Sequence, residues 1–164
     1  MTEALKIVTL GLREEIFAVD ANVVREILDM VPITAVPNSD PFVSGLINVR
    51  GRVVPLADLH VRFGMETPAP TIDTRIVVVD VELNGEPTTV GILADKVYEV
   101  AEVTARSVQE TPKLGMRWRP EFIQGIGKRG DDFMAIIDLS RLLNHSGPID
   151  EIAGAVTGDG RAVR

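Results

Sequence analysis

Cysteine is absent from the sequence, and histidine occurs only at His60 and His145. Without cysteine there is no disulfide framework and no thiol chemistry, which is compatible with a reducing cytoplasm. The two histidines are far apart in sequence and no His-Glu-x-x-His motif occurs, so no zinc site is expected. We predict that both histidines are solvated, His60 on the surface of a short helix and His145 at the start of a C-terminal tail.

Long apolar runs are also absent. No stretch of eighteen or more apolar residues could cross a bilayer as a helix, and the N-terminus lacks the features of a secretory signal. Aromatic residues make up only 4% of the chain, and the net charge is −7. Such a chain is repelled by nucleic acid and by anionic lipid, and the one short basic cluster, at 117–119, is too small to change this. We therefore expect a cytoplasmic protein that binds neither.

The residue patterns of known catalytic sites are missing. No glycine-rich phosphate loop opens a long helix, and the paired carboxylates Glu14-Glu15 and Asp131-Asp132 fall in expected turns, where they favour solubility. We predict that the protein is not an enzyme and that it binds no metal, nucleotide or other cofactor.

The chain has 164 residues, of which 45% are hydrophobic. Most of its local sequence patterns are those of β-strands. The clearest is a hairpin in which runs at 75–83 and 88–93 flank Asn84-Gly85, because both turn residues tolerate positive φ. Helices are expected to be short, each starting at an N-capping aspartate. The four candidate caps are Asp20, Asp58, Asp95 and Asp138. The predicted fold class is all-β with short helices.

The chain repeats itself after about eighty residues, too long a period for a solenoid. Phe-Val-Ser-Gly-Leu at 42–46 returns as Phe-Ile-Gln-Gly-Ile at 122–126, and each copy is followed by Arg-Gly and then Asp-Leu. This order indicates a duplication into two small barrels, each ending in a capping helix. We expect one domain over 1–146, a connector near 64–72 and a flexible tail at 147–164. The expected buried residues are Val77, Val79, Ile92, Ile126 and Ile136.

Two charged residues stand among apolar neighbours. Arg50 lies in the hairpin at 47–55, and Glu26 lies between Val23-Val24 and Ile27-Leu28. A structural role and a binding role are equally compatible with these positions. A charge in such a stretch is tolerated most easily when it is paired and partly solvated.

Several motifs, in order and covering 4–144, resemble the CheW family of chemotaxis coupling proteins. They are Val-Arg-Glu-Ile at 24–27, Ile-Thr-Ala-Val-Pro-Asn at 33–38, the run at 42–59, and the later segments 90–93, 122–125 and 136–143. The resemblance implies two intertwined five-stranded SH3-like barrels. It also implies an adaptor or scaffold that couples methyl-accepting chemoreceptors to a CheA-type histidine kinase. Such an adaptor is a monomer alone and is recruited to receptor arrays near the membrane.

The resemblance also implies site residues. The receptor-binding candidates are Val24, Glu26, Gly45 and Arg50, and the kinase-binding candidates are Ile33, Val36, Pro37 and Pro55. The resemblance implies that Glu26 and Arg50 pair with each other, so we predict a partly exposed ion pair beside the groove between the barrels. The sequence departs from the family pattern at Val49, where leucine is usual, and at His60, where arginine is frequent. The second departure puts any charged role of that position in doubt.

Other functions remain open at this point. A CheW-like scaffold could serve a non-flagellar pathway such as pilus motility. A regulatory piece of a kinase is less favoured, because no kinase or phosphotransfer segment accompanies these motifs. A small-molecule-binding barrel is less favoured, because barrels of this size are normally filled by their own side chains.

Overall fold

The computed structural model describes residues 4–37, 40–104 and 120–144, so His145, the cluster at 117–119 and the tail at 147–164 lie outside it. Within these residues the chain is mostly β, as predicted. The strands are β1 (Ala4–Leu12), β2 (Glu15–Asp20), β3 (Val24–Asp29), β4 (Val43–Val49), β5 (Arg52–Ala57), β6 (Arg75–Leu83), β7 (Glu86–Ala94), β8 (Lys96–Thr104), β9 (Ile123–Arg129) and β10 (Asp132–Ile137). The helices are α1 (Leu59–Arg62), α2 (Leu139–Asn144) and the 3₁₀ turns η1 (Ala21–Val23) and η3 (Pro120–Phe122).

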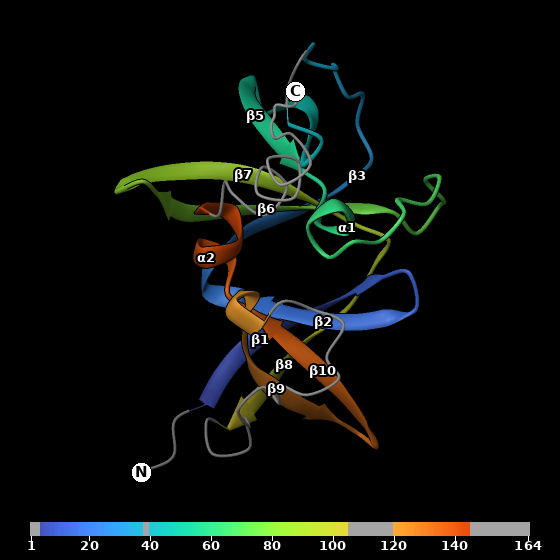
Figure 1. Ribbon diagram of the computed structural model, residues 1–164, viewed down its shortest axis with the longest axis vertical. Helices are drawn as coiled ribbons and strands as arrows, with labels where there is room; N and C mark the ends of the chain where they lie inside the picture. Colours follow the sequence, from blue (N-terminus) through green and yellow to red (C-terminus); the bar gives the residue numbers. More distant parts are fainter. Residues whose placement is uncertain (1–3, 38–39, 105–119, 145–164) are drawn as a thin grey trace, which may run out of the picture.

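The strands form two five-stranded sheets, stacked one above the other in Figure 1. The lower sheet, in the order β8-β1-β2-β10-β9, is called the first barrel, and the upper one, β3-β6-β7-β5-β4, the second barrel. Neighbouring strands are antiparallel, except for one parallel pair in each barrel, β2 with β10 and β5 with β7. Both barrels therefore share one pairing pattern, as a duplication requires, and the predicted fold class is confirmed.

The two barrels are intertwined along the chain. The second barrel takes its strands from 24–94, whereas the first combines β1 and β2 with β8, β9 and β10. The chain therefore passes between the barrels at η1 and again at Asp95. The segment at 64–72 joins α1 to β6 within the second barrel, so our expectation that it connects the two halves is wrong. Repeat spacing could not reveal this, because the N-terminal hairpin pairs with strands from the far end of the sequence.

The repeated motifs have matching roles in the two barrels. The carbonyl of Phe42 accepts the N–H of Asp58 at 2.8 Å, and the carbonyl of Phe122 accepts that of Asp138 at 2.9 Å. Each aspartate then caps its helix, because the Asp58 carboxylate accepts the N–H of His60 and the Asp138 carboxylate accepts that of Arg141. Phenylalanine and aspartate thus fix each helix to the start of an edge strand.

The capping prediction is confirmed for three of the four aspartates. Asp20 caps η1 through the N–H of Asn22, as expected. Asp95 caps no helix, because it is followed by the nine-residue strand β8. The strand was missed because a bulge between Thr9 and Leu10 shifts its register against β1 and interrupts the alternation of apolar residues.

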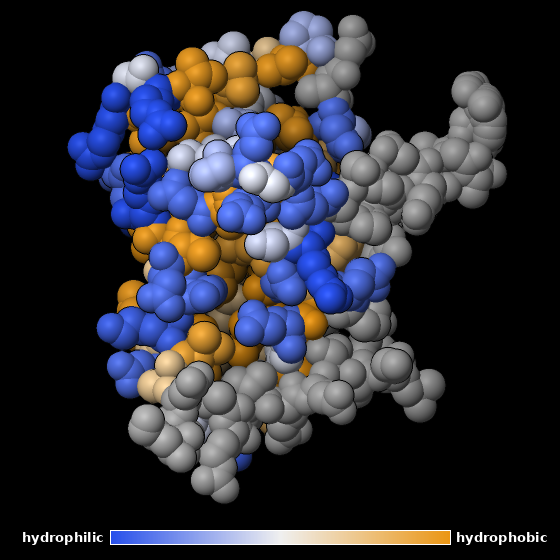
Figure 2. Space-filling model, turned by 90° about the vertical axis from the view of Figure 1, so that its left-hand side faces the viewer, coloured by the Kyte–Doolittle hydropathy of each residue, from blue (hydrophilic) through white to orange (hydrophobic). Residues whose placement is uncertain are grey.

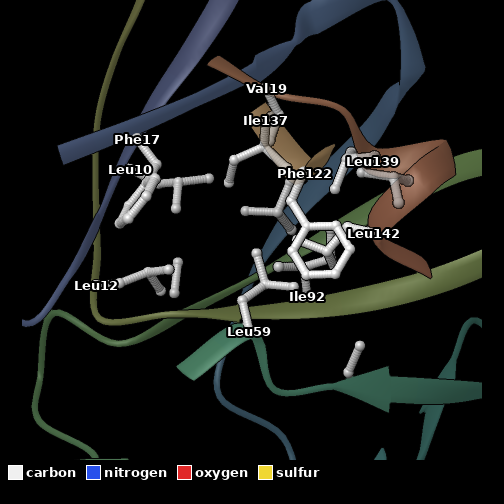
Figure 3. Packing of buried hydrophobic residues seen from close by; sticks show 14 of the residues in the cluster. Leu10, Leu12, Phe17, Val19, Leu59, Ile92, Phe122, Ile137, Leu139 and Leu142 are labelled. Atoms are coloured by element: carbon white, nitrogen blue, oxygen red, sulfur yellow. The ribbon is translucent and has the colours of Figure 1, made fainter. Parts of the chain in front are cut away.

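The hydrophobic core has three parts. One cluster fills the first barrel, a second fills the second barrel, and the largest lies between them, with Leu10, Phe17, Phe122 and Leu59 meeting in Figure 3. We call the last the inter-barrel cluster. It contains residues from both sheets and both α-helices. Each barrel therefore buries the apolar face that the other would leave exposed to water.

The predicted buried residues are distributed over these clusters. Val77, Val79 and Ile92 are fully buried in the inter-barrel cluster, and Ile136 is fully buried inside the first barrel. Ile126 is only partly buried, so its place in the core was overestimated. It lies on β9, an edge strand, where fewer neighbours cover the side chain.

Candidate protein-binding site

Glu26 and Arg50 form the predicted ion pair. The Arg50 guanidinium donates from Nη2 to Glu26 Oε1 at 3.0 Å and from Nε to Oε2 at 3.1 Å, a two-pronged geometry that also fixes its orientation. The Arg50 side chain is 78% exposed and that of Glu26 only 19%. This hydrogen bonding holds the pKa of Glu26 below its ordinary value and raises that of Arg50. Both groups therefore stay charged at neutral pH.

The pair joins the two edge strands of the second barrel. Glu26 lies on β3, and Arg50 occupies the β4–β5 turn with φ 52°, followed by Gly51 with φ 84°. The Asn48 side chain accepts the N–H of Gly51 at 2.8 Å and stabilises this turn. The turn therefore holds the Arg50 backbone while its side chain reaches across to Glu26.

Beside the pair lies a hollow of about 390 Å³, which we call the mouth of the second barrel. All of its lining comes from that barrel: Arg25, Glu26, Val49, Arg50, Arg52, Val54, Val78 and Thr89. The expectation that the pair lies beside the groove between the barrels is therefore wrong. The reason is topological, since β3 and β4 belong to the same sheet.

A weaker ion pair lies on the same rim. Arg25 Nη1 is 3.5 Å from Asp80 Oδ1, and the Thr89 hydroxyl donates to the same oxygen at 2.6 Å. Asp80 is exposed on β6. The mouth thus has an apolar floor and a charged rim.

Gly45 serves close packing. Thr34 and Leu46 exchange two backbone hydrogen bonds of 2.8 Å, which lay the segment after β3 along β4. A Cβ atom on Gly45 would overlap the Thr34 carbonyl oxygen and lie 2.7 Å from Ile33 Cγ2. Glycine is therefore required for this approach. It places a receptor-binding candidate directly against a kinase-binding candidate.

The kinase-binding candidates lie on two neighbouring segments. Ile33 and Val36 are 38% and 36% exposed in the segment after β3, and Pro37 is exposed beside them. Pro55 lies on β5 opposite Leu46, the residue that pairs with Thr34. The candidates therefore adjoin one another across β4.

One exposed apolar residue of this region was not predicted. Val53 is 71% exposed and lies two residues before Pro55 on β5, on the same side of the strand. A β-branched residue in a short hairpin indicates a strand, but it does not indicate which side of the strand faces solvent.

On the face drawn in Figure 2, apolar patches come to the surface over the upper barrel and where the two barrels meet.

Val24 does not join the other receptor-binding candidates. It lies opposite Val79 at the start of β3 and packs against the inter-barrel cluster. A register shift between Val24 and Glu26 separates the two environments. The structure thus brings together Glu26 and Arg50, and places Gly45 and Val24 elsewhere on the same barrel.

Comparison with known proteins identifies the family. Residues 6–147 match the CheW-like domain. The chain is 35% identical to chemotaxis protein CheW of Rhizobium meliloti over 77% of its own length and 84% of that protein. It is 33% identical to the probable chemotaxis protein CheW of Rhizobium etli, over 89% and 97%. The scaffolding protein TtCheW of Thermoanaerobacter tengcongensis has a crystal structure that matches with a TM-score of 0.78 at 33% identity, covering 88% and 91%.

The chain belongs to the CheW-like family. The match extends over both barrels, so the whole described fold is that of a CheW-like domain. The chain is therefore a chemotaxis scaffold or adaptor, as the sequence motifs predicted.

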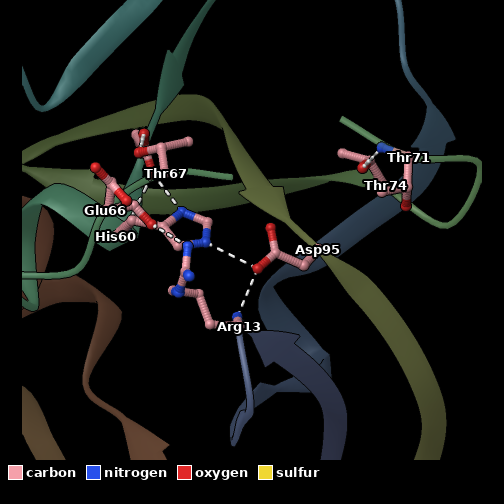
Figure 4. Close-up of polar contacts among 8 residues, drawn as sticks. Arg13, His60, Glu66, Thr67, Thr71, Thr74 and Asp95 are labelled. Carbon is pink, nitrogen blue, oxygen red and sulfur yellow. Dashed lines mark hydrogen bonds and ion pairs between the residues drawn. The ribbon is translucent and has the colours of Figure 1, made fainter. Parts of the chain in front are cut away.

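His60 is buried in this CheW-like domain, whereas we expected it to be solvated. Its side chain is fully buried, with Nδ1 2.6 Å from Asp58 Oδ1 and Nε2 3.0 Å from Asp95 Oδ2 (Figure 4). The prediction of a solvated histidine is wrong, because Asp58, which caps α1, also forms a hydrogen bond with the buried ring. Asp95 is 35 residues away in sequence, and no local pattern indicates this contact.

The described residues contain neither a metal-binding cluster nor a membrane-spanning helix. Across 4–37, 40–104 and 120–144, no group of three or more His, Cys, Asp or Glu side chains is placed to hold a metal ion. No helix in these ranges is long and apolar enough to span a membrane.

Proposed function

We propose that this chain couples the signalling tip of a chemoreceptor to a CheA-type histidine kinase through protein–protein contacts alone. The family match carries the proposal, because it covers both barrels and includes every candidate site residue. The relatives named above are chemotaxis proteins, and one solved relative is described as a scaffolding protein. A scaffolding role in a solved relative favours an adaptor over a small-molecule-binding barrel.

The receptor contact is proposed at the mouth of the second barrel, through Glu26 and Arg50. An exposed guanidinium held in one orientation by a largely buried carboxylate is a directional donor for a partner. Gly45 and Val24 would act indirectly, since Gly45 is packed under the segment after β3 and Val24 against the inter-barrel cluster.

The kinase contact is proposed across β4, through Ile33, Val36, Pro37 and Pro55. Ile33, Val36 and Pro37 are exposed and Pro55 is partly exposed, and apolar side chains that lie side by side at the surface are the usual core of a protein interface. Val53 adds to the same region, because it is the most exposed apolar residue of β5.

No catalytic step is proposed for the chain itself. The interiors of both barrels are occupied by their own side chains, including Ile7 and Ile136 in the first and Val54 and Leu56 in the second. A scaffold of this kind would act in the cytoplasm at receptor arrays, and as a monomer before it assembles.

The test is reconstitution with a CheA homologue and a receptor signalling fragment from the same genome. The chain should form a complex with each, and kinase autophosphorylation should rise only when all three are present. Failure to bind either protein in size-exclusion and pull-down assays would refute the proposal.

A further inference from the structure

His60 lies at the start of α1 with a carboxylate on each ring nitrogen. The contacts are 2.6 Å from Nδ1 to Asp58 and 3.0 Å from Nε2 to Asp95, and the ring has no exposed surface. A neutral imidazole carries one N–H and can satisfy one of the two carboxylates. The other would then face a nitrogen lone pair. The doubly protonated ring donates to both, so the geometry matches the imidazolium.

Each carboxylate is itself held in place. The other oxygen of Asp58 accepts the hydroxyl of Thr67, and Asp58 Oδ1 also accepts the N–H of His60. Asp95 Oδ2 accepts the backbone N–H of Arg13 at 2.5 Å. Neither acid can turn away from the ring without breaking a further bond.

The charged surroundings come from three elements. Asp58 belongs to the cap of α1, Asp95 to the β7–β8 link, and Arg13 to the β1–β2 turn. The Arg13 guanidinium donates to the backbone carbonyl of Glu66 at 3.0 Å, after α1. Glu14, Glu15 and Glu66 line the adjoining hollow. The nearest ionised groups are thus the two acids that face the ring.

These elements belong to different barrels. α1 follows β5 of the second barrel, the β1–β2 turn belongs to the first, and Asp95 lies where the chain passes from one to the other. The N–H of Asp95 also donates to the Gly11 carbonyl at 2.9 Å. We propose that His60 is a protonation-dependent latch that fastens α1 to the crossing point between the two barrels.

The direction of the pH effect follows from the contacts. Burial works to lower the pKa of His60, but the hydrogen bonds and charges of Asp58 and Asp95 outweigh it and raise the pKa above 6.5. Its stabilisation is therefore complete below pH 6.5 and is lost as the pH rises through the raised value. For Asp58, burial works to raise the pKa, and bonding to His60 and Thr67 lowers it below 3.8. Its contribution is present above 3.8 and is lost on acidification through the lowered value.

The first experiment follows the thermal stability of the full chain between pH 5.5 and pH 9. Wild type should lose stability with rising pH, by about tenfold in the folding equilibrium constant for each unit that separates the folded and unfolded pKa of His60. His60→Gln should be less stable at low pH and should lack this slope. His60→Arg, which stays charged, should also lack it. An equal slope in wild type and His60→Gln would refute the latch.

The second experiment needs no variant at His60. NMR titration of the imidazole signals, with His145→Gln to assign them, should give a His60 pKa above 6.5. Hydrogen exchange, corrected for its intrinsic pH dependence, should become faster around α1 and residues 94–97 above that pKa. A His60 pKa at or below 6.5, or unchanged protection there, would overturn the proposal. Neither result depends on receptor or kinase binding, so failure here leaves the proposed function untouched.

Discussion

Arg50 illustrates how a single residue can serve binding with little effect on folding. Its backbone is fixed by a tight turn with positive φ, and its side chain is largely exposed. A partly exposed ion pair contributes little to stability, because water solvates both charges in the unfolded chain and still screens the exposed guanidinium in the folded one. A partner that covers the pair removes this screening, so binding depends on it more strongly.

We therefore predict that Arg50→Ala weakens receptor binding and kinase activation while leaving the melting temperature close to that of wild type. The affinities of wild type and Arg50→Ala for receptor and kinase, together with their thermal melts, test this prediction. Arg141→Ala is the matched control, since Arg141 is a largely exposed arginine on α2 that pairs with Asp138 and does not line the mouth. The double variant Glu26→Arg/Arg50→Glu should fold normally and recover only part of the binding. Unchanged receptor affinity, or a loss of stability that accounts for every defect, would contradict the prediction.

The residue scale is also where sequence reasoning had its clearest success and its clearest failure. The ion pair was predictable because two charges in apolar stretches require partners, and the family resemblance indicated that Glu26 and Arg50 are partners of each other. The burial of His60 was not, because one of its partners is Asp95, far along the chain. Long-range partners of this kind follow from topology, which the sequence did not reveal.

At the scale of elements, strands with clear turn chemistry were predicted well and strands with bulges were not. The expected run at 75–83 coincides with β6, and Asn84 and Gly85 adopt the positive φ expected of that hairpin. β8 was missed where its register shifts against β1. Regular alternation is thus informative only where pairing is regular.

The position of the segment after β3 depends on Gly45. We predict that Gly45→Ala displaces this segment, destabilises the fold by about 1–3 kcal/mol through overpacking, and weakens kinase binding. The added Cβ has no space beside Thr34 and Ile33, and φ at this position is +153°. Urea unfolding and kinase affinity measure the two effects. Ser44→Ala, one residue earlier on β4, is the control. A variant with normal kinase affinity would show that the segment tolerates displacement.

Burial should set the cost of truncating core side chains. Ile92→Ala should destabilise by about 2–5 kcal/mol, because a fully buried side chain leaves a cavity when it is removed. Ile126→Ala should cost less, since Ile126 is only partly buried, and Val53→Ala should have little effect. Urea melts of the three variants give the order. A cost for Ile92→Ala as small as that for Val53→Ala would contradict the assignment of the inter-barrel cluster.

At the scale of the molecule, the duplication was readable from sequence but its three-dimensional arrangement was not. The repeat of Phe-x-x-Gly and Asp-Leu indicated two similar barrels, and each motif has an equivalent place in its barrel. Intertwining was implied by the family resemblance and could not be derived from spacing. It requires β1 and β2 to pair with strands that follow the second barrel in sequence.

This arrangement predicts that the two barrels unfold together. The inter-barrel cluster is larger than either barrel's own cluster, and its members Val77, Val79 and Ile92 would face water if the first barrel opened. The second barrel is continuous in sequence at 24–94, so it could fold alone only with that apolar face exposed. We expect a single unfolding transition, in which Ile136→Ala in the first barrel and Val78→Ala in the second shift every probe to the same extent. Far-UV circular dichroism and resolved NMR signals from each barrel, followed through one urea titration, test this. Two separated midpoints in either variant would mean that the barrels are independent units, and the inter-barrel cluster would then be a docking surface instead of a shared core.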